Sequence, residues 1–278
     1  MKLHVIDTGF FKLDGGAMFG VVPKVMWQKF YPADADNLCT WAMRCLLIEE
    51  ANRLILIDTG LGGKQSEKFF ANYQPHGDAS LLTSIQKAGY SADDVTDVIL
   101  THLHFDHCGG AITGNAENGY RPAFKNAVYW SHSAHWQWAV KPNAREKASF
   151  LKENILPIEE SGQLKFLDKA DFAMAEIKFH IMNGHTEAMV LPEVKYKEHS
   201  IVYCADLLPS PHHVPLPYVM AYDVRPLQTL SEKAVFLGEA VAQKKIMFFE
   251  HDRSIECCRL LESEKGIRPT EGFLLKDL

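Results

Sequence analysis

The stretch Thr101-His102-Leu103-His104-Phe105-Asp106-His107-Cys108-Gly109-Gly110 places four potential metal ligands within six consecutive positions. Imidazole and carboxylate groups are the ligand types of zinc and similar divalent ions. Alternate residues of an extended segment project the same way, so His102 and His104 can share one ion while Asp106 and His107 face a second. The two glycines allow a sharp backbone turn, leading into a helix whose N-terminus adds positive potential. The stretch therefore predicts a metal site.

Three further polar residues each stand directly beyond an apolar strand, as the histidine stretch does after the predicted strand Asp97 to Leu100. They are His185 after Ile177 to Met182, Asp206 after Ile201 to Ala205, and His251 after Ile246 to Glu250. Ligands at strand ends along one sheet edge can converge on a pocket, because a rigid scaffold holds them there. We expect these three residues to complete the metal site, with Asp206 able to bridge two ions.

The rest of the chain mixes strands and helices without a linker, a low-complexity tract or an internal repeat. Met43 to Glu49 and Arg53 to Asp58 flank a turn and predict a hairpin, and further strands are expected at 127–130, 176–182, 189–194, 200–205 and 246–249. Apolar residues recur at helical spacing over Ser80 to Ala88 and Leu227 to Val241, where Thr229 and Glu232 have the spacing of a capping box. The pattern predicts a single mixed α/β domain over residues 1–278.

Composition argues against several classes of protein. The 278 residues carry a net charge of −6 with no basic cluster, which disfavours nucleic acid as a partner. No apolar run is long enough to cross a membrane, and Asp7 interrupts the opening where a signal peptide would be apolar, so we expect a cytoplasmic location. Six cysteines lack CxxC spacing and are expected to be reduced thiols: Cys39, Cys45, Cys108, Cys204, Cys257 and Cys258.

The order HxHxDH, then a distant His, Asp and His, resembles the metallo-β-lactamase-fold hydrolases over nearly the whole chain. The resemblance implies a four-layered αβ/βα sandwich and two divalent ions, with zinc expected. Asp58-Thr59-Gly60 matches the family loop that supports the metal-binding turns. The implied ligands of the first ion are His102, His104 and His185, those of the second are Asp106, His107 and His251, and Asp206 is shared.

Two segments carry a more specific resemblance, to the quorum-quenching N-acyl-homoserine lactonases: Asp14 to Lys24 with Trp27, and Pro217 to Asp223. It implies that a metal-bridging hydroxide opens the lactone ring, while Asp106 orients the hydroxide and passes a proton to the leaving alkoxide. Some lactonases place a catalytic tyrosine three residues after the bridging Asp, where this chain has Pro209, so Tyr222 is the substitute candidate beside the carbonyl.

The segment Asp14 to Asn37 follows neither the helical nor the strand period, which predicts an ordered loop with exposed apolar side chains. Within it, Met18, Phe19 and Trp27 are candidates to line a groove for the acyl chain of a small-molecule substrate, although core packing explains them equally well. The part from Phe19 to Tyr31 can instead pack against a second subunit, giving a homodimer.

Other functions fit parts of the same pattern. The main alternative is hydrolysis of another ester, a thioester or a phosphoester, since the same ligands suit all of these substrates. A β-lactamase is disfavoured because no signal peptide is visible, and a diiron redox protein because His104 stands where such chains have Glu and no flavin domain follows. A binding module that has lost activity would lack ligands, whereas all seven positions are filled.

Overall fold

The computed structural model describes residues 1–169, 172 and 176–278, and these residues form two compact units. Unit 1 comprises 1–9, 43–72, 76–169 and 172, and unit 2 comprises 10–42, 73–75 and 176–278. The strands β1 (Lys2–Asp14) and β2 (Leu38–Glu50) contribute residues to both units. The single domain over residues 1–278 stays a prediction.

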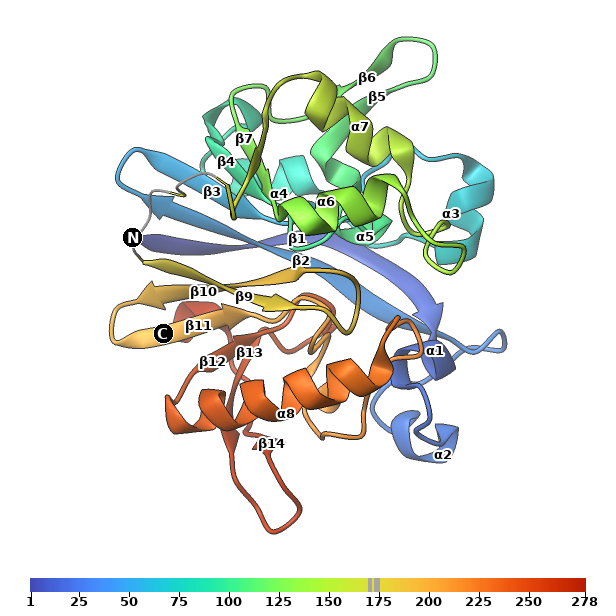
Figure 1. Ribbon diagram of the computed structural model, residues 1–278, viewed down its shortest axis with the longest axis vertical. Coiled ribbons are helices and arrows are strands. Elements are labelled where there is room, and N and C mark those ends of the chain that lie inside the picture. The colour runs from blue at the N-terminus through green and yellow to red at the C-terminus, as the bar shows by residue number, and fades with distance from the viewer. Residues whose placement is uncertain (170–171, 173–175) are drawn as a thin grey trace. The chain divides into compact units, whose positions relative to one another are not determined.

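Unit 1 is built on a six-stranded sheet of order β1-β2-β3-β4-β7-β8 (Figure 1). The predicted hairpin is confirmed, because β2 pairs antiparallel with β3 (Arg53–Ile57) and brings Leu46 opposite Ile57. The next strands run parallel: β4 (Asp97–Ile99), β7 (Val128–Ser131) and β8 (Leu164–Phe166). Strands in a parallel arrangement are covered on both faces, which explains why β3 and β4 are continuous buried runs.

The other elements of unit 1 surround this sheet. They are α3 (Glu67–Tyr73), α4 (Leu81–Lys87), α5 (Phe105–Cys108), α6 (Ser133–Val140), α7 (Lys152–Glu160), the hairpin of β5 (Ile112–Asn115) with β6 (Gly119–Pro122), and 3-10 turns at Ala92–Asp94 and Gly109–Ala111. Helix α4 confirms the predicted helix, with Ser80 and Thr83 forming a capping box at its start. Helix α7 packs against the β5–β6 hairpin and closes the core that contains Leu56 and Val98.

Unit 2 is built on a second six-stranded sheet, of order β14-β13-β12-β11-β10-β9. Its strands are β9 (Ile177–Met182), β10 (Met189–Tyr196), β11 (His199–Tyr203), β12 (Ile246–Phe248), β13 (Cys257–Leu261) and β14 (Arg268–Pro269). All neighbours pair antiparallel except β11 and β12, which are parallel. The strands predicted in this part of the chain are confirmed, and so is the mixed α/β class.

Helix α8 (Pro226–Ala242) packs against β13 in unit 2 (Figure 1). The predicted helix is confirmed, but its cap differs from the predicted one, and its buried face agrees with the predicted apolar positions only in part. Arg225 precedes the first turn, and the Glu232 carboxylate accepts from the backbone N–H groups of Asn183 and Gly184 instead of closing a capping box. The buried positions are Thr229, Lys233, Phe236, Leu237 and Ala240, whereas Leu227 is 80% exposed. Leu237 is thus buried as the apolar spacing predicts, whereas Lys233 is buried at a position that a charged residue in the sequence marks as exposed.

The segment expected to be irregular contains two short helices of unit 2, α1 (Gly15–Phe19) and α2 (Lys24–Trp27). The Asp14 carboxylate starts α1 by accepting from the backbone N–H of Ala17. Two 3-10 turns, Pro211–His213 and Leu275–Asp277, complete unit 2. All six cysteines are buried free thiols, as predicted. Among the described residues, no helix is both long and apolar enough to cross a membrane.

Candidate functional site

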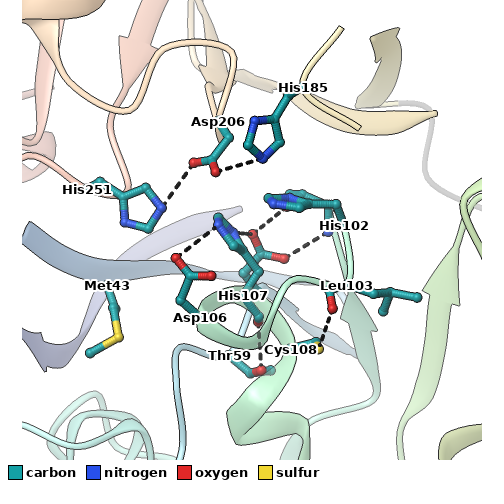
Figure 2. A network of polar contacts seen from close by, with 12 residues as sticks. Met43, Thr59, His102, Leu103, Asp106, His107, Cys108, His185, Asp206 and His251 are labelled. Atoms are coloured by element: carbon teal, nitrogen blue, oxygen red, sulfur yellow. Dashed lines mark hydrogen bonds and ion pairs between the residues drawn. The ribbon is translucent and has the colours of Figure 1, made fainter. Parts of the chain in front are cut away.

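The histidine stretch of unit 1 begins just beyond β4 and runs into α5, so a strand end positions it as predicted. His102 and His107 are fully buried, and His104 and Asp106 are 8% and 7% exposed. The structure brings the candidate ligand atoms of His102 and His104 within 4.8 Å of each other, and likewise those of Asp106 and His107. His107 Nε2 lies 3.7 Å from Asp106 Oδ2 (Figure 2).

Asp58 organises this stretch from the end of β3. Its Oδ1 accepts from the Thr101 backbone N–H at 2.8 Å, and its Oδ2 accepts from the Thr101 hydroxyl at 2.6 Å. Because the single hydroxyl proton of Thr101 goes to Asp58, Thr101 Oγ1 acts as the acceptor for His102 Nδ1 at 3.1 Å. His107 Nδ1 donates to Asp58 Oδ2, also at 3.1 Å. Both rings therefore keep Nε2 as the lone-pair nitrogen, which is the form that binds a metal.

The two glycines after the ligands serve a different purpose from the predicted sharp turn. Neither has a positive φ. A Cβ atom at Gly109 would lie 2.0 Å from the Leu61 carbonyl oxygen, and one at Gly110 would lie 2.2 Å from the Thr59 carbonyl oxygen. Glycine is required because the backbone of residues 59–61 approaches α5 closely, and this approach lets the Thr59 hydroxyl donate to the His107 carbonyl at 2.9 Å (Figure 2).

Two buried residues of unit 1 that the sequence analysis left unassigned also contact the histidine stretch. His135 Nε2 accepts from the backbone N–H of Leu103 at 2.8 Å, which fixes the chain between the first two histidines. Glu146 Oε1 lies 3.6 Å from His104 Nε2. Neither residue belongs to a recognisable spacing, so the sequence holds no signal that could have identified them.

In unit 2, the three remaining candidate ligands form one buried cluster. Asp206 lies between the two histidines, with its Oδ2 3.0 Å from His185 Nε2 and its Oδ1 3.1 Å from His251 Nε2 (Figure 2). All three follow the strands that the sequence predicted, β9, β11 and β12. A carboxylate with one oxygen toward each imidazole has the geometry of a bridging ligand.

Both histidines of this cluster have a partner on the other ring nitrogen. His185 Nδ1 donates to Asp223 Oδ1 at 2.8 Å, and His251 Nδ1 donates to the Ala42 carbonyl at 2.8 Å. Burial lowers the pKa of His185, but the carboxylates of Asp206 and Asp223 outweigh burial and raise that pKa to about 10. A cation is thus favoured beside Asp206, whether it is the proton or a metal ion that replaces it.

The predicted groove residues lie in an aromatic cluster of unit 2. Met18, Phe19 and Trp27 are at most 1% exposed, and the Phe19 ring stacks on Trp27 at 5.5 Å and on His213 at 4.7 Å between ring centroids. Packing within unit 2 accounts for their burial, so their role as a groove lining stays a prediction. The exposed apolar side chains of this segment are others: Val21, Val25, Met26 and Phe30.

Tyr222 lies on the loop before α8, with a side chain that is 38% exposed. Its chain neighbour Asp223 is the buried partner of His185. The loop is tied to α1 by the Ala221 N–H, which donates to the Ala17 carbonyl at 2.8 Å. The catalytic role of Tyr222 stays a prediction, and the loop that carries it is anchored next to a candidate ligand.

The model of the metallo-beta-lactamase superfamily matches residues 44–238, and the chain therefore belongs to this superfamily. The predicted metallo-β-lactamase fold is confirmed by a probable metal-dependent hydrolase from Staphylococcus aureus, whose structure aligns with a TM-score of 0.88 at 28% identity over 100% of this chain and 98% of that one.

Lactonases are among the similar proteins. An N-acyl homoserine lactonase from Bacillus cereus is 30% identical over 166 residues, which are 56% of this chain and 56% of the relative. The chain thus spans about half the length of this curated relative. AidC, described as a dizinc quorum-quenching lactonase in complex with a product, shares the fold with a TM-score of 0.77 at 23% identity, over 99% of this chain and 97% of that one.

Proposed function

We propose that the chain is a dinuclear-metal hydrolase that opens the lactone ring of N-acyl-homoserine lactones. The observation that carries the proposal is the state of the seven predicted ligands. Each is buried, a hydrogen bond at Nδ1 orients four of the five histidines, and the Glu146 carboxylate faces the fifth, His104, at 3.6 Å. Buried imidazoles and carboxylates in such number are costly unless a cation or specific partners compensate them.

The donor set fits divalent metal ions. In our proposal His102, His104 and His185 would hold one ion, Asp106, His107 and His251 would hold the other, and Asp206 would be shared by the two. Five neutral imidazoles with two carboxylates suit zinc, and also iron, cobalt or manganese. The family relationship supports the joint use of both clusters, and zinc is the ion named for AidC.

When bound, two divalent ions supply a water of lowered pKa and a Lewis acid for the carbonyl oxygen. Asp106 accepts a proton of the attacking water as the new C–O bond forms at the carbonyl carbon, and returns this proton to the ring oxygen when the ring C–O bond then breaks. The Tyr222 hydroxyl donates to the oxygen on which negative charge develops. Asp58 and Asp223 do not touch the substrate, but they keep His107 and His185 in the ligand tautomer.

Three considerations support an acyl lactone as the substrate. The lactonase from Bacillus cereus and several similar proteins carry that activity in their names. The loop with Tyr222 and the helix α1 resemble lactonase segments and are joined by a backbone hydrogen bond. The residues proposed to line the acyl groove, Met18, Phe19 and Trp27, lie on α1 and α2 of this same segment and are apolar, as such a lining requires.

The test is whether the zinc-loaded protein opens the ring of short- and long-chain N-acyl-homoserine lactones. Ring opening is monitored through the proton that the product acid releases. His104→Ala and Asp106→Asn are expected to reduce turnover by at least about a hundredfold, since each removes a proposed ligand. Tyr222→Phe is expected to lower kcat by about a hundredfold with little change in metal content. His199→Ala, on the rim of the unit 2 sheet, is the matched control and should turn over at the original rate.

The possible outcomes distinguish the proposed substrate from the proposed metal site. Turnover that the ligand variants abolish and His199→Ala retains supports the proposal. A protein that binds two ions but is inert toward every lactone refutes the substrate and turns the search to other esters, thioesters and phosphoesters. A protein that binds no divalent ion refutes the dinuclear site.

A further inference from the structure

The candidate ligand histidines differ in which ring nitrogen faces a protein partner. Four of them have a hydrogen-bond partner at Nδ1, which leaves Nε2 as the ligand atom: His102, His107, His185 and His251. His104 is the reverse case, because its Nε2 faces the carboxylate of Glu146 at 3.6 Å. A neutral imidazole carries a proton on one nitrogen and a lone pair on the other, so the partner decides which atom can bind a metal.

The Glu146 carboxylate is itself held in place. The residue is 3% exposed, and its Oε2 accepts from Trp138 Nε1 at 2.7 Å and from Asn143 Nδ2 at 2.5 Å. Both hydrogen bonds hold Oε2, while the other oxygen, Oε1, lies 3.6 Å from His104 Nε2. Since the donors come from α6 and from the segment between α6 and α7, the packing of unit 1 sets the position of the carboxylate.

The His104 ring is also confined by its neighbours on the chain that follows Glu146. Its centroid lies 4.8 Å from that of Phe150, and the Phe105 backbone N–H donates to the Ser149 carbonyl at 3.0 Å. Ser149 and Phe150 in turn donate their N–H groups to the Glu146 carbonyl. One short segment thus supplies a carboxylate and a packing ring to His104, and a backbone acceptor to the next residue, Phe105.

We infer that Glu146 is a positioning residue that holds the His104 proton on Nε2 and thereby presents Nδ1 to the first metal ion. The inference rests on the proposed dinuclear site and deepens it. An anionic acceptor is suited to this role, because binding of a cation at Nδ1 makes the Nε2 proton more positive and strengthens its attraction to the carboxylate. The carboxylate also raises the basicity of the ligand nitrogen.

Two measurements test this role without using activity. The first is a long-range ¹H–¹⁵N spectrum of the imidazoles in the zinc-loaded protein, which reports which nitrogen of each ring carries the proton. His104 is expected to be protonated on Nε2, and the other four histidines on Nδ1. The second is stepwise zinc binding in competition with a chromophoric chelator, for the unmodified chain, Glu146→Gln and the control Glu160→Gln, an exposed residue at the end of α7.

Glu146→Gln is expected to weaken one of the two zinc-binding steps by 10- to 100-fold and to leave the other unchanged, because only one proposed ion contacts His104. Glu160→Gln should bind both ions as the unmodified chain does. If Glu146→Gln fails to fold, Trp138→Phe keeps the carboxylate, removes one of its donors, and should weaken the same step by a smaller factor.

Several results would overturn the inference. They are a His104 ring protonated on Nδ1 in the zinc-loaded protein, equal zinc affinities for Glu146→Gln and the unmodified chain, or parallel weakening of both steps together with a lower Tm. Failure of the proposed function looks different: lactones remain intact although His104 has the expected tautomer and two ions are bound. A chain that binds no zinc contradicts both.

Discussion

Lys233 is the group whose replacement tests the packing of unit 2 most directly. Its side chain is fully buried on the inner face of α8, and Nζ donates to the carbonyls of Pro215, Leu216 and Tyr218 at 3.0, 3.5 and 2.9 Å. These carbonyls belong to the loop that leads to Asp223. Burial lowers the pKa of Lys233 to about 7, although Asp223 opposes the shift.

The depressed pKa fixes the sign of a pH effect. In the unfolded chain the lysine releases its proton near its ordinary pKa of 10.5, whereas in the folded chain it does so near 7. Between these values the unfolded state binds more protons, so the free energy of unfolding rises with pH. One proton corresponds to about 1.4 kcal/mol per pH unit, which is about 2 kcal/mol between about pH 8 and pH 9.5.

The perturbation is Lys233→Met, which keeps the length of the side chain and removes its titration. Urea unfolding at about pH 8 and pH 9.5 should show the original chain gaining about 2 kcal/mol relative to the variant over this interval. Lys178→Met, at an exposed position of β9, is the control and should show no such divergence. A difference between the original chain and Lys233→Met that is independent of pH would refute the reasoning, because Lys233 would then keep its ordinary pKa.

Three other expected outcomes follow from the buried contacts. Asp58→Asn should lower the free energy of unfolding by about 2–3 kcal/mol in urea titrations, because charge-assisted hydrogen bonds are lost; an unchanged midpoint would contradict this. Gly109→Ala should cost about 1–3 kcal/mol by overpacking, whereas Gly63→Ala, with no neighbour within 4 Å, should stay within about 0.5 kcal/mol in the same measurement. Burial lowers the pKa of His213 to about 3, so the neutral ring contributes to the free energy of unfolding above its unfolded pKa, and this contribution is lost as the pH falls. An NMR titration should find the His213 ring neutral at about pH 5, and a midpoint near 6.5 would argue against this prediction.

The elements that the sequence predicted well are those whose pattern is local. The strands β3, β4 and β12 are buried on both faces, so each is a continuous apolar run that can be recognised from the sequence alone. β1 and β13 were not anticipated. β1 has many half-buried residues, and two charged residues, Asp7 and Lys12, interrupt its apolar sequence. β13 is the short run Cys-Cys-Arg-Leu-Leu. Sheet neighbours stabilise such strands, and a neighbour distant in the chain leaves no trace in local periodicity.

The buried face of α8 was misassigned for a related reason. Lys233 reads as a solvent-exposed position, and only the three carbonyls of residues 215–218 make its burial favourable. The apolar spacing over Leu227 to Val241 begins with Leu227 and Leu230, but Leu227 is exposed and Leu230 is only partly buried. The spacing of apolar residues along a helix cannot reveal that a lysine is buried and a leucine exposed, because the groups that compensate the lysine are backbone carbonyls of another segment.

The metal ligands form a pattern that is local in the sequence, whereas the groups that orient them do not. Histidines and aspartates indicate a metal site because few other roles require them at such density. Four of them lie within one short stretch, so their spacing can be recognised directly in the sequence. Their partners are a threonine hydroxyl, a backbone carbonyl and single carboxylates such as Glu146, all of which are common in any sequence. Yet these partners decide which imidazole nitrogen is available. A relative could therefore keep the whole ligand motif and still bind metal weakly if it lost Glu146 or Asp223, so tests of this site should address the orienting residues as well as the ligands.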